Sequence, residues 1–548
     1  MKKTTREKAS MLRMLLYAVI LLLWGNTYLE AQDLPSEKVE VVSNFEARLA
    51  DANKIKLEPQ ANIQEVKDQQ FSYEVIEKVL PINYLPPTIK SIAVRTEELP
   101  QAYNGFVKAG FGYPLSPYLD AGYRMEGNDN GSNFLARLTH HSANDNNVEN
   151  QRFSETAALL KGTYMSDYGF AVDGKLGASL DRNYFYGYDR SDTISYEKED
   201  VQNRINVFEL GAKIYNGTES RSKLNYWAGV NAYALANNFA TRETGLNLDL
   251  GLTKWFGDNP LTIALGTDLT RLKDTTIQKL NNFFANPSFS FGTQSVRIKF
   301  GARLETSNEE YFFYPDVEVL LNVVGNNLSI FFGADGELRK NTFRMLSDYN
   351  PFLVSELSDL RNSSYYDFYA GVKGIVSGLE YSLQGGYKPT NDLALYQVNL
   401  EKPWMRFDVL YDTTNIIYFK GSIKGNIASN FDLSASAVYN IYDTKNAAEA
   451  WYLPQLQANV GVAYLAFDQK LRLKADVFVN DPVPFEDDLP FGEEPNLLLD
   501  VSLGADFFFT ENVGLFLHLN NLAANNYRRW YNYPTYGLNV LGGITARF

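Results

Sequence analysis

The stretch Leu538-Asn-Val-Leu-Gly-Gly-Ile-Thr-Ala-Arg-Phe548 at the end of the chain decides the fold. Its even-numbered residues are apolar or glycine and end on an aromatic, whereas its odd-numbered residues are mostly polar or small. Successive side chains of a β-strand point to opposite faces, so this strand has one apolar face and one mixed face. A transmembrane barrel strand needs both, one face for lipid and one for a wet lumen. A half-buried strand of a soluble sheet is the alternative.

The same alternation recurs upstream with the same chemistry. Four more segments place aliphatic or aromatic side chains on one face and charged or amide side chains on the other: 170–181, 246–253, 296–305 and 471–480. About twenty such strands over one region favour a single closed sheet over a soluble sandwich. We predict an all-β fold, a single transmembrane antiparallel β-barrel of about 22–24 strands over residues 104–548. Aromatic residues make up 14% of the chain, which fits aromatic girdles at two membrane interfaces.

Connection lengths agree with a barrel of this kind. If the first strand runs outward, the even-numbered connections are mostly short turns, among them 166–169, 257–259, 325–327, 428–430 and 510–512. The odd-numbered connections include the long ones, predicted at about 183–203, 274–285, 339–364, 480–496 and 520–534. Short turns on one side and long loops on the other are the asymmetry of outer-membrane barrels.

The N-terminus has the composition of an export signal. Five basic residues precede or overlap the start of an unbroken apolar run from Met14 to Trp24. That run suits a signal peptide and is too short to cross a bilayer as a helix. We predict that residues 1–31 are a cleaved signal peptide and that the chain is located in the cell outer membrane; a retained membrane anchor is the alternative. The formal charge of -14 argues against nucleic acid as a partner.

Residues 32–103 differ from the barrel region. They are charged, hold six prolines and lack sustained alternation. We predict a short, mostly irregular N-terminal periplasmic segment. Either it is a disordered tail, or it enters and gates the lumen or docks a partner. A barrel of about 22 strands is wide enough to need a plug, so this segment, inward loops, side chains or a partner must fill it.

Three stretches resemble the TonB-dependent receptor superfamily, in the plug-lacking form common in Bacteroidota. They are residues 103–112, residues 313–333 and residues 515–548. The last of these stretches includes Asn521-Leu522 and Tyr527, which resemble a loop of the family. The resemblance implies an outer-membrane receptor-like barrel that takes part in transport. It departs from a full receptor because only 72 residues (103 minus 31) precede the barrel, fewer than the usual plug domain has. The segment Glu37-Lys-Val-Glu-Val-Val42 loosely resembles the motif that contacts TonB, carried here by Glu37, Val39, Val41 and Val42.

The sequence offers few candidate catalytic or metal-binding residues. The chain has no cysteine, which excludes disulfides and thiolate metal sites, and we expect no cofactor and no metal. It has three histidines, His140, His141 and His518, and no nucleophile-elbow or zinc-protease motif, so we expect no enzyme. The acidic loop 481–494 is interpreted as solvated, and the run Arg528-Arg-Trp-Tyr531 as an exposed rim.

Two groups of residues are assigned roles by position. Gly543, Ala546 and Phe548 are predicted to form the signal that the barrel-insertion machinery engages. The face rule predicts a mixed-charge lumen, with these cations pointing inward: Arg297, Lys299, Arg303, Arg472 and Lys474. The expected partners are outer-membrane lipid, the insertion machinery and a periplasmic or outer-membrane protein.

Two functions remain open from the sequence. The first is solute binding and passage across the outer membrane. The second is a non-transporting accessory or structural subunit of an outer-membrane protein assembly or export complex. Strand count and loop asymmetry favour the first, and the missing plug with a proline-rich segment favours the second.

Overall fold

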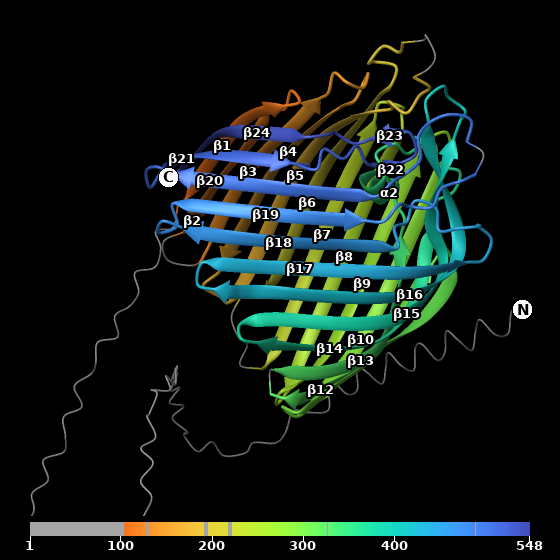
Figure 1. Ribbon diagram of the computed structural model, residues 1–548. Helices are drawn as coiled ribbons and strands as arrows, with labels where there is room; N and C mark the ends of the chain where they lie inside the picture. Colours follow the sequence, from red (N-terminus) through yellow and green to blue (C-terminus); the bar gives the residue numbers. More distant parts are fainter. Residues whose placement is uncertain (1–102, 128–130, 191–194, 218–221, 326, 488) are drawn as a thin grey trace, which may run out of the picture. The chain divides into compact units, whose positions relative to one another are not determined.

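The computed structural model describes residues 103–127, 131–190, 195–217, 222–325, 327–487 and 489–548. In this part of the chain, 22 strands form one antiparallel sheet that closes on itself where β1 pairs with β24. Figure 1 shows the resulting barrel. This confirms the predicted all-β class. Within the described residues, no helix has the length and apolar character that crossing a membrane requires.

The strands follow one another around the wall in chain order. The first half comprises β1 (Gly105–Tyr113), β2 (Tyr118–Glu126), β3 (Asn133–Asn144), β4 (Arg152–Met165), β5 (Phe170–Tyr184), β6 (Gln202–Asn216), β7 (Leu224–Asn237), β8 (Arg242–Phe256), β9 (Asn259–Lys273), β10 (Ile277–Gly292) and β11 (Val296–Ser307). The second half comprises β12 (Glu310–Val324), β13 (Leu328–Lys340), β14 (Asn362–Val376), β15 (Leu379–Asn399), β16 (Arg406–Ala428), β17 (Phe431–Thr444), β18 (Leu456–Ala466), β19 (Leu471–Asn480), β20 (Leu498–Phe508), β21 (Val513–Asn520) and β24 (Asn539–Arg547). The helix α2 (Phe343–Tyr349) and the short pair β22 (Arg528–Trp530) and β23 (Tyr533–Pro534) lie in connections.

The two ends of the barrel differ, and this difference sets its orientation. All even-numbered connections are short, and they share their end with the C-terminus (Figure 1). The long connections leave the other end: 185–201, 341–361, 445–455, 481–497 and 521–538. The loop-bearing end is therefore the outer one and the turn end the periplasmic one. One predicted loop is wrong: residues 277–285 belong to β10, where Asn282 points inward and donates to Asn362 Oδ1 at 3.1 Å.

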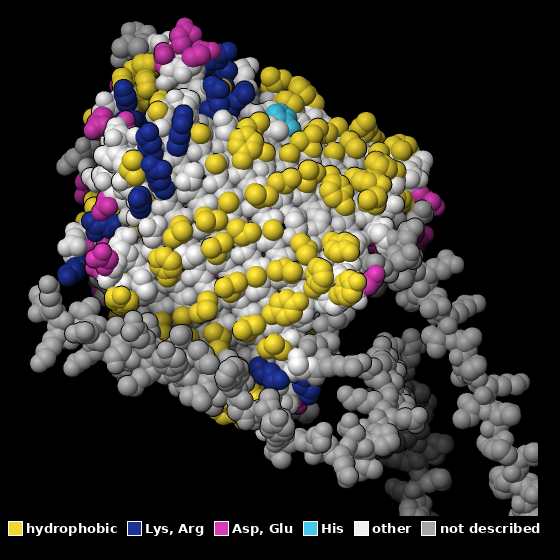
Figure 2. All heavy atoms as spheres, turned by 180° about the vertical axis from the view of Figure 1, so that it is seen from behind, with side chains coloured by type: hydrophobic (Ala, Val, Ile, Leu, Met, Phe, Trp, Pro, Cys, Tyr) yellow, Lys and Arg dark blue, Asp and Glu magenta, His cyan; other side chains and the backbone are white. Residues whose placement is uncertain are grey.

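The outward face of the wall is apolar. On β8 the residues Leu246, Leu248, Leu250 and Leu252 are all exposed, whereas Asp249 lines an interior cavity. Figure 2 shows rows of hydrophobic side chains across this face. Exposed aromatic rings mark its periplasmic edge: Tyr123, Tyr164, Tyr226, Tyr464, Phe507 and Phe548. An apolar band with an aromatic edge is what a barrel in lipid presents, because only alternate residues meet hydrocarbon.

Candidate functional site: a capped lumen

The lumen wall carries both signs of charge. Lys299 donates to Asp316 Oδ1 at 2.6 Å, and Arg303 pairs with Glu305, which is 3% exposed. The structure places Arg297 on the same face of β11, opposite Leu320 on the neighbouring strand. Arg472 and Lys474 line a cavity of about 540 Å³ near the turn end, together with Asp432 and Asp476. The wall is therefore polar and carries charges of both signs, some of them in ion pairs.

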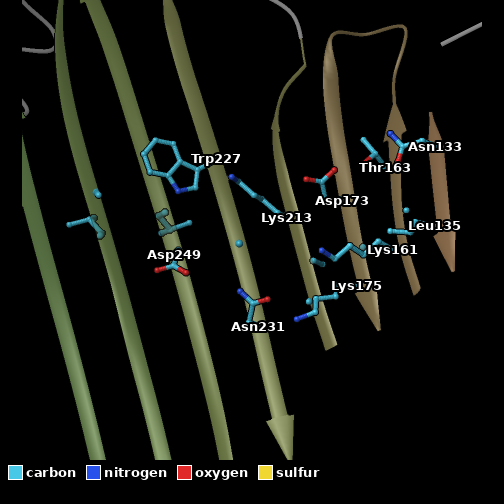
Figure 3. Close-up of a pocket in the computed structure, with 18 of the residues that line it drawn as sticks. Asn133, Leu135, Lys161, Thr163, Asp173, Lys175, Lys213, Trp227, Asn231 and Asp249 are labelled. Atoms are coloured by element: carbon cyan, nitrogen blue, oxygen red, sulfur yellow. The ribbon is translucent and has the colours of Figure 1, made fainter. Parts of the chain in front are cut away.

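One cavity is a stretch of this wall across β2–β10. It has a volume of about 920 Å³. Figure 3 shows side chains from neighbouring strands pointing into it, among them Lys161, Asp173, Lys213, Trp227 and Asp249. Within the described part of the chain, Lys161, Lys213 and Asp249 take part in no ion pair, although the Nζ of Lys213 lies 5.5 Å from the ring centre of Tyr215. Unpaired charges beside one indole ring suit a polar solute with an apolar part.

Loops fold together over the outer mouth of the barrel. Their buried side chains form one aromatic-rich core, which we call the cap core: it joins α2, 350–360, 185–188, 405–407, Tyr452, Val483 and 530–533. The ring of Trp530 lies 5.2 Å from that of Tyr396 and 5.1 Å from that of Phe407. Burying each such side chain stabilises the closed arrangement by about 1.5–3 kcal/mol.

Hydrogen bonds join the loops of the cap core to one another. The main-chain oxygen of Pro534 accepts from Gln151 Nε2 at 2.6 Å and from the Tyr186 hydroxyl at 3.0 Å. The side-chain amide of Asn532 donates to the main-chain oxygen of Tyr188 at 3.1 Å. These bonds link segments that are hundreds of residues apart in sequence, so the cap is one packed unit.

The helix α2 ties the cap to the inner wall. The carboxylate of Glu243, which is 0% exposed, accepts from the main-chain N–H groups of Phe343 at 2.7 Å and Arg344 at 3.2 Å. The Tyr233 hydroxyl donates to the same carboxylate at 2.9 Å. A carboxylate suits this place, because the first N–H groups of a helix have no partners within the helix.

Two ion pairs on the same wall complete the attachment. Lys340, just before α2, donates to Asp268 Oδ1 at 2.5 Å and to the Thr270 hydroxyl at 2.8 Å. Arg344 pairs with Glu209, which also accepts from Lys175 Nζ at 2.6 Å. Lys175 in turn lines the cavity of Figure 3. The ion-paired residues that attach the cap therefore include a residue that lines the lumen cavity.

One interpretation of loop residues is wrong, and a second holds for Asp487, Glu493 and Glu494, which are exposed, but not for Glu486. Trp530 and Tyr531 lie inside the cap core and are not an exposed rim. Glu486 of the acidic loop accepts from Val398 N at 2.6 Å and from the Tyr452 hydroxyl at 3.0 Å. Burial raises the pKa of Glu486 above its ordinary value, although both donors stabilise the charged form. No sequence pattern distinguished a buried loop aromatic from an exposed one.

The histidines do not form a site together. The Nδ1 of His140 lies 2.8 Å from the hydroxyl of Thr156, and its neighbour His141 points to the opposite face of the wall, where it packs on Tyr118. His518 lies inside the barrel, 3.3 Å from Lys108 Nζ. In the described residues there is no group of three acidic or histidine side chains that could hold a metal ion.

The three residues of the predicted insertion signal lie along the seam between β1 and β24. Gly543 is opposite Gly110, and a Cβ at Gly543 would lie 2.1 Å from the main-chain oxygen of Ala109. Ala546 is opposite Val107, and the ring of Phe548 stacks on that of Tyr123 at 6.4 Å. Glu37, Val39, Val41 and Val42 lie outside the described residues.

Comparisons with known proteins identify the fold. No family model matches the chain, and no curated protein matches it. Solved structures do match. The ferric-catecholate import receptor Fiu of E. coli K12 has a TM-score of 0.61 at 10% identity, over 82% of each chain. The ferripyoverdine receptor of Pseudomonas aeruginosa has a TM-score of 0.60 at 11% identity, over 82% of this chain and 72% of that one.

The siderophore receptor PiuA of Acinetobacter baumannii gives a similar result, with a TM-score of 0.60 at 10% identity over 82% of each chain. The chain therefore has the fold of these outer-membrane receptor barrels. At this identity the likeness concerns the fold, and the functional argument depends on the capped lumen.

Proposed function

We propose that the chain is an outer-membrane barrel that binds a polar solute in its lumen and lets it cross, with the cap as the gate at the outer mouth. One observation carries this proposal: the wall cavity that holds Lys161, Lys213 and Asp249 adjoins, through the shared lining residues Lys175 and Asn231, a smaller cavity of about 300 Å³ that α2 lines. A structural barrel has no need for unpaired lumen charges, since each is easily matched or replaced.

The solute class follows from the cavity. Lys161 and Lys213 offer charge to an anionic group, Asp249 to a cationic one, and Trp227 a flat apolar surface. One matched structure is described as a ferric-catecholate import receptor and another as a ferripyoverdine receptor, and these descriptions support an import role. Coupling to TonB through Glu37, Val39, Val41 and Val42, and membership of the plug-lacking Bacteroidota group, are part of the proposal.

The test is single-channel conductance in planar bilayers. The chain has no cysteine, so Thr241→Cys with Ser355→Cys introduces one disulfide between the wall and the cap, where the Thr241 hydroxyl donates to the main-chain oxygen of Ser355 at 2.7 Å. We expect rare openings in the parent chain, none in the oxidised variant, and recovery after reduction. Replacing residues 343–360 by a short Gly-Ser linker should give a permanently open pore.

A pore that conducts equally with the disulfide formed or reduced would refute the gate. A closed pore after removal of 343–360 would refute the role of this segment in the gate.

A second function, an accessory or structural subunit of an assembly or export complex, is favoured by the extent of the cap core. A mouth sealed by so many buried aromatic residues resembles a domain core more than a gate. Purification in mild detergent distinguishes the two functions. A partner that stays bound to the parent and to the disulfide variant alike, without conductance in either, supports the accessory function.

A further inference from the structure

Three pairs of like charges lie on the outward face of β5–β10, near the loop-bearing end. Arg182 is directly opposite Arg204, Arg242 is opposite Lys273, and Arg271 is opposite Lys279. All six side chains are exposed. They share a face with the exposed apolar residues Leu180, Phe208, Leu246, Leu265 and Phe283. Figure 2 shows Lys and Arg side chains gathered toward one end of this face.

These cations have no counter-ion among the residues that the structure describes. None of the six takes part in an ion pair there, and the guanidinium of Arg204 donates to the neutral Gln202 Oε1 at 3.1 Å. Directly opposite side chains on antiparallel strands have Cβ atoms about 4.5–5.5 Å apart, and like charges in that position destabilise the sheet. Three such pairs on one face therefore indicate an anion that binds from outside.

An apolar groove lies on the same strands, further toward the membrane centre. It is a cavity of about 580 Å³ on the outward face of β4–β7, lined mainly by Ala158, Leu160, Leu176, Ala178, Phe208 and Leu210. Ala178 precedes Arg182 by four residues on β5, and Phe208 follows Arg204 by four on β6. At about 3.3 Å per residue, the groove begins roughly 13 Å from the cations. This is the arrangement of a lipid, with a charged headgroup above an acyl chain.

The spacing of the cations distinguishes between lipids. Arg182 with Arg204 forms one cluster on β5 and β6, and the other four residues form a second cluster on β8–β10. The intervening β7 separates the clusters by two strand spacings, about 10 Å. One phosphate contacts only one cluster, whereas a headgroup with two separated phosphates contacts both.

We propose that this surface binds an acylated sugar bisphosphate of the outer leaflet, with one phosphate at each cluster and an acyl chain in the groove. Arginine and lysine bind phosphate through charge-assisted hydrogen bonds, and clusters of four to eight cations at a membrane surface are typical of anionic-lipid binding. This site is on the outside of the wall and is independent of the lumen and its cap.

The test measures lipid binding to the full-length chain by native mass spectrometry. The probes are a bisphosphorylated acyl-glucosamine disaccharide, its dephosphorylated form, and phosphatidylglycerol. We expect the bisphosphate to bind at least tenfold more tightly than either of the others. Each removed cation should weaken binding roughly fivefold. The variants are Arg182→Gln with Arg204→Gln, and the four-residue change of the second cluster to Gln.

The matched control is Lys402→Gln with Lys445→Gln, two exposed cations in other loops at the same end; it should leave binding within twofold of the parent. Equal binding of the dephosphorylated lipid, or equal binding of phosphatidylglycerol, would overturn the proposal. So would unchanged lipid binding together with loss of a co-purifying protein, which would make the surface a protein contact.

A second readout separates lipid binding from a structural role. In detergent without lipid, Arg182→Gln with Arg204→Gln relieves repulsion, so the melting temperature should stay the same or rise. With the bisphosphate present, the parent should gain melting temperature and this variant should gain less. A lower melting temperature of the variant in plain detergent would mean that the cations stabilise the wall itself, and it would contradict the proposal.

Discussion

Changing Glu243 to Gln should release the cap from the wall while the barrel stays intact. The two carboxylate oxygens of Glu243 accept three hydrogen bonds, from Tyr233, Phe343 and Arg344, and the side chain is completely buried. A glutamine has the same shape but replaces one oxygen by an NH₂ group. In either orientation that NH₂ faces at least one main-chain N–H, so at least one buried donor loses its acceptor.

The size of the effect follows from that lost acceptor. Leaving a buried polar group unsatisfied costs about 1–3 kcal/mol. Since about 1.4 kcal/mol is a factor of ten in an equilibrium, a loss of about 2 kcal/mol makes the open state roughly thirtyfold more populated. The barrel itself should be unaffected, because every strand pairing of β8 is a main-chain contact.

The assay is open probability in planar bilayers, supported by hydrogen exchange of residues 343–360. The control is Glu356→Gln, which makes the same change of charge on an exposed side chain of the same loop. We expect a ten- to hundredfold rise in open probability for Glu243→Gln, from a cost of about 1.4–2.8 kcal/mol, and none for the control. An open probability within twofold of the parent, with unchanged exchange, would refute the role of Glu243 as the attachment of the cap.

Three further predictions concern the wall, the seam and the cap. Leu248→Arg, on the lipid face, should destabilise the inserted barrel by about 2–4 kcal/mol in refolding titrations, whereas Asn247→Arg, facing the lumen, should not; equal stabilities would contradict the face assignment. Gly543→Ala should lower the stability of the barrel by about 1–3 kcal/mol, because a Cβ there would collide with the neighbouring strand at the seam. The control Gly542→Ala should not, since its Cβ would lie 3.6 Å from the nearest atom. Phe548→Ala should lower the amount of the protein in the membrane, and a normal amount would show that insertion does not need that ring. Because burial raises the pKa of Glu486, the folded cap binds a proton more readily than the unfolded loop. At neutral pH the buried charge of Glu486 lowers the stability of the folded cap, and this cost disappears as the pH falls toward the ordinary carboxyl pKa of about 4.3. Hydrogen exchange in 481–497, corrected for intrinsic rates, should therefore slow as the pH falls. The same pH response in Glu486→Gln would contradict this.

The wall could be predicted from the sequence because side chains along a strand alternate between its two faces, so the apolar residues of a segment fix which face meets lipid. Leu246 to Leu252 on β8 and the final eleven residues each assign every side chain to lipid or lumen. The short turns could be predicted for a related reason, since residues such as Gly257 and Asn259 adopt tight turns readily. The segment 277–285 is harder to assign from sequence, because Asn281 and Asn282 are residues that turns favour and that a lumen wall also accepts.

The cap could not be predicted in the same way. Its core brings Tyr186, Phe352, Tyr452 and Trp530 together from four separate loops, and no local pattern encodes such meetings. The width of the barrel predicts that something fills the lumen, and inward-folded loops are one possibility, but no local pattern shows which loops fold inward. Only long-range packing distinguishes Trp530 in the core from an exposed anchor of the same composition.

The seam between β1 and β24 sets the order of events in the protein's biogenesis. The main chain of Gly105 exchanges hydrogen bonds with that of Phe548, the last residue. Until β24 arrives, β1 has an open edge whose N–H and C=O groups pair with any strand offered. The wall can therefore close only after the whole barrel has left the ribosome and crossed the inner membrane. Until then the exposed edge of β1 requires a chaperone that keeps it from pairing with other strands.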